Sequence, residues 1–95
     1  MRIHWTANAI KHLVKIYEYI SLNSPTYAKR TVDRITRRSE QIENHPMSGR
    51  KVPEYDREDI RELIEEPYRI IYRIKPEQID VVVVIHCSQL LSNDI

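Results

Sequence analysis

The sequence predicts an α+β fold in which an N-terminal strand, an antiparallel two-helix hairpin and a three-stranded antiparallel meander form one domain over residues 1–95. Three observations predict this class. Apolar residues recur at helical spacing in the first half of the chain, whereas the second half alternates at strand spacing. A Ser-Pro pair divides the helical half in two. The connections between the later strands are short enough to force antiparallel pairing.

The first half begins with a short strand over residues Arg2–Trp5, and Thr6 suits the N-cap of the helix that follows. Apolar residues then recur at the i, i+3, i+4, i+7 spacing of one helix face: Ile10, Leu13, Val14, Tyr17 and Ile20. This helix is expected to end near Leu22 and Asn23.

A second helix restarts at once, with Ser24 as the N-cap and Pro25 in the first helical position. Pro46 ends it. One stripe of this helix is apolar or small: Ala28, Val32, Ile35, Ser39 and Ile42. Its other faces carry basic residues: Lys29, Arg30, Arg34, Arg37 and Arg38. So short a link predicts that the two helices pack as an antiparallel hairpin.

The second half predicts a loop over Met47–Asp59 and then the meander. Gly49 is the sole glycine of the chain, so we expect a positive φ there. Three strands follow: Ile60–Ile64, Tyr68–Ile74 and Ile79–Ile85. The last is apolar except for Asp80, which predicts a central strand covered on both faces. For residues 89–95 a helical turn and a frayed end both remain open.

Charge and composition narrow the functional classes. The net charge is +1, which argues against a protein that grips long stretches of phosphate. Neither a long apolar run nor a signal-peptide pattern is present, so we expect a cytoplasmic protein. Cys87 is the single cysteine, which excludes an internal disulfide. Because Cys87 and the four histidines lack ligand spacing, no metal and no cofactor is expected.

Arginines in the predicted sheet are the first candidate site. Arg69 and Arg73 fall on one face of their strand, and Arg61 on the neighbouring strand is a possible third member. Guanidinium groups bind phosphate or carboxylate groups through two parallel hydrogen bonds, so the three form a candidate target-binding clamp. The alternative is a solvated face on which they pair with Glu54, Glu62 or Glu65.

A second candidate site would carry out proton transfer. His86 ends the last strand, on a face with Val82 and Val84, and is a candidate general acid or base. With Glu54 from the loop and Arg69 from the sheet, it would complete an acid–base pair and a charge stabiliser for RNA cleavage. A hydrogen-bonded strand-end histidine and an ordinary loop glutamate are the alternatives.

In this order, several segments resemble the RelE/ParE superfamily, the toxins of bacterial type II toxin–antitoxin or plasmid stabilisation systems. The matching segments are Ile3-His4-Trp5 with Ala7 and Ala9, Ile42–Pro46, Gly49-Arg50, Val52-Pro53-Glu54, Ile60–Leu63, Tyr68–Ile74 and His86. The resemblance covers nearly the whole chain, and Arg61-Glu62-Leu63 and Tyr68–Ile74 look more like the ParE branch. Cys87 and Gln89 depart from the His-Gly-Arg-Arg-like ending of that branch.

The resemblance implies a helix hairpin on a curved antiparallel sheet and a small antitoxin that wraps and neutralises the toxin. We expect a helix or strand of that partner to fill the apolar groove of the hairpin. ParE-like members poison DNA gyrase, and this activity is favoured, with Arg61, Arg69 and Arg73 as target-binding residues. One alternative is a RelE-like, ribosome-dependent mRNA endonuclease (an mRNA interferase) using Glu54, Arg69 and His86. The other is a degenerate, non-toxic relative that only binds the antitoxin.

Overall fold

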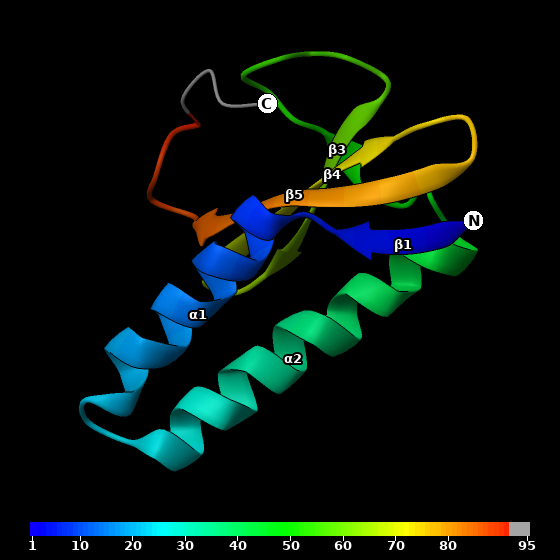
Figure 1. Ribbon diagram of the computed structural model, residues 1–95. Helices are drawn as coiled ribbons and strands as arrows, with labels where there is room; N and C mark the ends of the chain where they lie inside the picture. The colour runs from blue at the N-terminus through cyan, green and yellow to red at the C-terminus, as the bar shows by residue number, and fades with distance from the viewer. Residues whose placement is uncertain (92–95) are drawn as a thin grey trace.

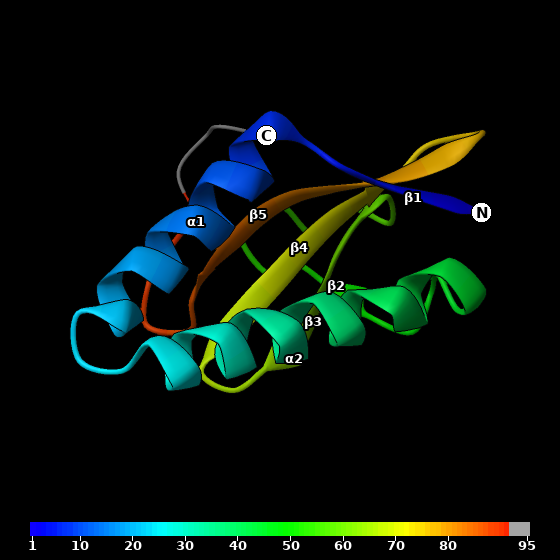
Figure 2. The same cartoon turned by 60° about the horizontal axis from the view of Figure 1, so that its bottom comes forward.

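The computed structural model describes residues 1–91, and it shows a five-stranded sheet with both helices packed on one face (Figures 1 and 2). The elements are β1 Arg2–Trp5, α1 Ala7–Ser21, α2 Pro25–Asn44, β2 Arg50–Lys51, β3 Ile60–Glu65, β4 Tyr68–Ile74 and β5 Gln78–His86. The predicted α+β class and element order are confirmed, and β2 is an additional short strand within the expected loop. Residues 89–91 lie in no helix or strand, and the rest of the segment predicted for 89–95 lies outside the described residues.

Both helices begin where the sequence predicts. The Thr6 hydroxyl accepts a hydrogen bond from the backbone N–H of Ala9 at 3.1 Å. The Ser24 hydroxyl accepts one from Tyr27 at 3.1 Å, with Pro25 in the first turn. Each hydroxyl satisfies a backbone donor that has no acceptor within the helix, which fixes the starting residue of each helix.

The main core lies between the helices and the sheet. Its buried members are Ala9, Ile35, Ile42, Leu63, Ile70, Tyr72, Ile79, Val81 and Val84. On α2 the buried stripe is nearly the predicted one, except that Thr31 is buried and Val32 is only partly so. Thr31 tolerates burial because its hydroxyl donates to the backbone oxygen of Tyr27 at 2.9 Å.

The apolar face of α1 is wider than the part that the sheet covers. Leu13 and Ile16 pack against the core. The other side of the stripe stays exposed: Ile10 at 49%, Val14 at 50% and Tyr17 at 40%. We call these three residues the exposed α1 stripe.

Strand β5 has two neighbours on one edge. β1 pairs with it in parallel over Gln78–Val81 only. Beyond Val81, α1 takes over that edge: Asn8 Nδ2 donates to the Val82 oxygen at 3.2 Å, and the Val84 N–H donates to His12 Nδ1 at 3.1 Å. Asn8 and His12 lie one helical turn apart, so one face of α1 replaces the missing strand.

A β-bulge in β5 changes which residues share a face. Ile71 pairs with Val83 and Tyr72 with Val81, which leaves Val82 as the extra residue. Val84 faces the helices, but Val82 packs on the opposite face, so the expectation that both share a face with His86 is wrong for Val82. That opposite face, which we call the outer face, has its own small core of Val52, Ile60, Ile71 and Val83.

Gly49 is required for space and not for an unusual backbone angle. Its φ is not positive, contrary to expectation; the positive φ of this loop is at Asp56, at 50°. A Cβ at Gly49 would lie 2.5 Å from the Tyr72 hydroxyl and 2.6 Å from the Glu62 backbone oxygen. The Tyr72 hydroxyl accepts from the Gly49 N–H at 3.0 Å and donates to the Pro46 oxygen at 2.6 Å.

Candidate functional site

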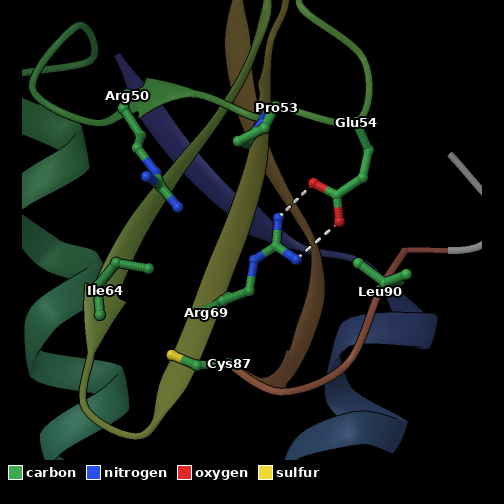
Figure 3. A pocket seen from close by; sticks show the side chains of 7 residues that line it. All are labelled: Arg50, Pro53, Glu54, Ile64, Arg69, Cys87 and Leu90. Carbon is green, nitrogen blue, oxygen red and sulfur yellow. Dashed lines mark hydrogen bonds and ion pairs between the residues drawn. The ribbon is translucent and has the colours of Figure 1, made fainter.

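Four charged side chains form one network on the outer face. The Arg69 guanidinium binds Glu54 through two hydrogen bonds of 2.8 Å each (Figure 3). The Arg69 Nε donates to Glu62 at 2.6 Å. The other Glu62 oxygen accepts from Arg50 Nε at 2.6 Å. The Glu62 side chain is fully buried and Arg69 is 7% exposed. We call Arg50, Glu54, Glu62 and Arg69 the outer-face network.

Strand register and one loop anchor place these groups together. Arg50 lies directly across from Glu62 in the β2–β3 pair. Arg69 lies across from Ile64, which puts it diagonal to Glu62 on the same face. Glu54 comes from the loop, which the buried Val52 holds against β3 through a 3.1 Å backbone hydrogen bond to Ile60.

The hydrogen bonds between Glu54 and Arg69 favour the charged form of both groups. Hydrogen bonds from Arg69 lower the pKa of Glu54 from 4.5 to about 2, against the opposing effect of desolvation. The same bonds raise the pKa of Arg69 further above its ordinary value. Glu54 is therefore ionised near neutral pH and bound on both oxygens. It is poorly suited to accept or donate a proton in a reaction.

The network also holds down the segment after β5. Arg69 Nη1 donates to the Gln89 backbone oxygen at 3.2 Å, and the Leu91 N–H donates to Glu54 at 3.2 Å. A hollow of about 410 Å³ remains beside these contacts (Figure 3). It is lined by Arg50, Pro53, Glu54, Ile64, Arg69, Cys87 and Leu90.

His86 does not join Glu54 and Arg69. It pairs with Tyr68 in the β4–β5 register, whereas Arg69 pairs with Ile85, so the two side chains lie on opposite faces of the sheet. The His86 ring meets Tyr68 edge-on, with the ring centroids 5.9 Å apart. The structure therefore brings together two of the three residues predicted for RNA cleavage, and separates the third from them.

The three predicted clamp arginines do not share a face. Arg61 lies across from Tyr72, on the helix-facing side, and donates to the Gly49 oxygen at 2.8 Å and to Glu58 Oε2 at 2.7 Å. Its side chain is only 11% exposed. Arg73 does share the outer face with Arg69, is 41% exposed and contacts Asp59 at 3.5 Å. Of the three, Arg73 is the one with substantial accessible surface.

Sequence reasoning missed Arg50 as a member of the network. The ion-pair alternative names Glu54 and Glu62 correctly for Arg69, but Glu65 instead lies near Arg34 and Arg38, at 3.7 and 3.9 Å. A sequence signal for Arg50 would have required the β2–β3 register, and β2 has only two residues.

Within residues 1–91 no group of three or more His, Cys, Asp and Glu side chains is arranged to hold a metal ion. In the same range, no helix is both long and apolar enough to cross a membrane.

Comparison with known proteins assigns the family. Residues 3–91 match the family described as the ParE toxin of the type II toxin–antitoxin system parDE. The Sinorhizobium fredii (strain NBRC 101917 / NGR234) protein named "Putative toxin Y4kP" is 34% identical over 90 residues, which span 93% of this chain and 90% of that protein. A solved structure titled "Chromosomal ParDE TA system from P. aeruginosa" aligns with a TM-score of 0.76 and 25% identity, covering 90% of this chain and 95% of that one. The chain therefore belongs to the ParE toxin family of type II toxin–antitoxin systems.

Proposed function

We propose that this ParE-family toxin acts in the cytoplasm by binding and inhibiting DNA gyrase, without bond-breaking chemistry of its own. Gyrase inhibition is the activity that the ParE resemblance implies. One structural observation supports the proposal that the protein breaks no bond. Glu54 and Arg69 are bound to each other, and His86 lies on the other face of the sheet. An endonuclease would need these groups to converge on one scissile phosphate.

Arg73 is the residue that we propose touches the target. Arg61 and Arg69 remain important as positioning residues, since both hold backbone segments in place. Arg73 is accessible, and its contact with Asp59 at 3.5 Å is loose enough for an external carboxylate or phosphate to compete with it.

We also propose that a cognate antitoxin neutralises the protein by covering the exposed α1 stripe. ParDE systems pair such a toxin with an antitoxin, and the stripe formed by Ile10, Val14 and Tyr17 is apolar surface that nothing in the described chain covers. An amphipathic segment of the partner would remove it from water.

Induction in cells tests the gyrase proposal against its two alternatives. We expect DNA breaks and an SOS response with intact mRNA, and loss of gyrase supercoiling activity when purified protein is added. Arg73→Ala should reduce this inhibition about tenfold, whereas Lys29→Ala, at an exposed α2 position, should leave it unchanged. Transcripts cut on ribosomes without DNA breaks would support the mRNA endonuclease instead. A folded protein without any toxicity would support the antitoxin-binding relative.

A further inference from the structure

A second hollow lies on the helix side of the sheet, between α1 and the adjoining ends of β4 and β5. Its volume is about 640 Å³, within the range of small-molecule sites. The described residues that line it include His12, Lys15, Tyr19, Tyr68, Ile85 and His86. None of the outer-face network is among them, so we treat it as a separate site and call it the α1 cleft.

The charged and hydrogen-bonding groups of the α1 cleft favour an anion. Within residues 1–91, no acidic side chain lines it, and Lys15 contributes an exposed ammonium group. Backbone N–H groups donate to Nδ1 of both imidazoles: Val84 to His12 at 3.1 Å, and Ser88 to His86 at 3.1 Å. Because an N–H can only donate, the neutral form of each ring carries its proton on Nε2 and is a donor there.

The same cleft also offers aromatic surface. Tyr19 is 76% exposed, so its ring is accessible to a ligand. Tyr68 and His86 meet edge-on at 5.9 Å and form an aromatic wall. Ile16 and Ile85, which are only partly buried, add apolar surface. Aromatic faces beside cationic donors are the combination that binds a stacked base and its phosphate.

We infer that the α1 cleft binds a nucleotide, with the base stacked on Tyr19 or Tyr68 and the phosphate held by Lys15 and the His86 Nε2–H. The nucleotide is either free or one unit of a single strand, since the contacts are the same. No bond is made or broken, so His86 serves here as a binding group. The inference does not depend on gyrase inhibition.

Titration of the purified full chain with AMP, followed by NMR, tests this inference. We expect shifts at Tyr19, Tyr68 and His86, and an AMP affinity about tenfold above that of inorganic phosphate, because phosphate alone cannot stack. A short oligo(dT) strand distinguishes the sources: tighter binding per site than AMP indicates a single-stranded ligand, and weaker binding indicates a free nucleotide.

Matched variants on α1 localise the site. Tyr19→Ala should weaken AMP binding about tenfold, whereas Tyr17→Ala, on the same helix but outside the cleft, should not. Lys15→Gln should weaken it as well, with Lys11→Gln as its control. Three outcomes would overturn the inference. The first is equal affinity for phosphate and AMP, and the second is an equal loss of AMP affinity in the paired variants. The third is a set of NMR shifts with N-acetyl-tyrosine amide but none with AMP. Gyrase is absent from the assay, so failure here leaves the gyrase proposal untouched.

Discussion

For Arg69, the sequence predicts the strand face correctly but not the burial of the side chain. Its position on the face shared with Arg73 is confirmed by the β4 pairings. Its burial is not predictable from alternation alone, because it depends on a loop carboxylate 15 residues away and on the strand register that brings Glu62 alongside. Alternation reports the face of a residue and says nothing of what covers that face.

Replacing Arg69 should destabilise the fold much more than replacing Arg73. Arg69→Ala leaves the buried Glu62 with Arg50 as its one remaining partner within residues 1–91, so we expect the free energy of unfolding to fall by about 3 kcal/mol. Arg73→Ala removes one loose surface pair and should cost less than about 1 kcal/mol. Urea denaturation measures both. Similar losses in the two variants would contradict the buried network.

The acid stability of the protein should depend on Glu54. Its folded-state pKa of about 2 lies below the ordinary 4.5, so its contribution is complete above pH of about 4.5 and is lost as the pH falls toward 2. Urea denaturation between pH 6 and pH 2.5 should show a smaller decline for Glu54→Gln than for wild type. Glu40→Gln, at an exposed α2 position, should follow the wild-type curve.

Gly49→Ala should destabilise the fold through crowding. The added Cβ meets the buried Tyr72 hydroxyl and the Glu62 backbone, and neither can move without breaking hydrogen bonds or strand pairing. We expect a loss of about 2 kcal/mol in thermal or urea denaturation, against less than about 0.5 kcal/mol for Ser48→Ala next to it. A neutral Gly49→Ala variant would contradict this packing.

Among the elements, α1 is predictable from the sequence only in part. Its existence and its start at Thr6 follow from apolar spacing and capping, and both are confirmed. The buried width of its apolar face is not encoded in that spacing, because it depends on how the helix axis lies against β5. The helix also completes the hydrogen bonding of the β5 edge through Asn8 and His12. The sequence does not indicate this role, because it depends on where the pairing of β1 with β5 ends.

Hydrogen exchange can test the edge role of α1. His12→Ala removes the acceptor of the Val84 N–H, so we expect that amide to exchange at least tenfold faster and the protein to lose about 1 kcal/mol of stability. Lys11→Ala, at the preceding exposed position, should change neither quantity. Unchanged protection of Val84 in His12→Ala would show that another group satisfies this N–H.

For the whole molecule, the order of elements was predictable and the order of strands was not. The meander of β3, β4 and β5 follows from short connections. The parallel pairing of β1 with β5 joins residues 2–5 to residues 78–81, and no local pattern specifies so distant a contact. The candidate sites share this limit, since each is built from segments far apart in the sequence.

The proposed binding of the antitoxin to the exposed α1 stripe can be tested by substitution. Val14→Glu places a charge in the surface proposed to meet the antitoxin, so binding measured by calorimetry should weaken at least tenfold. Because Val14 is half exposed, the stability of the toxin alone should change by less than about 0.5 kcal/mol. Lys11→Glu, on the same helix, controls for charge. Unaltered antitoxin affinity in Val14→Glu would direct the search to another surface.

The pairing of β1 with β5 has a consequence for the order of events during translation. The first strand has no partner until residues 78–81 have left the ribosome, and α1 cannot dock on Val82 and Val84 any earlier. The sheet of the nascent toxin therefore stays incomplete through most of its synthesis. An antitoxin that is already present can bind the toxin as soon as β5 has left the ribosome.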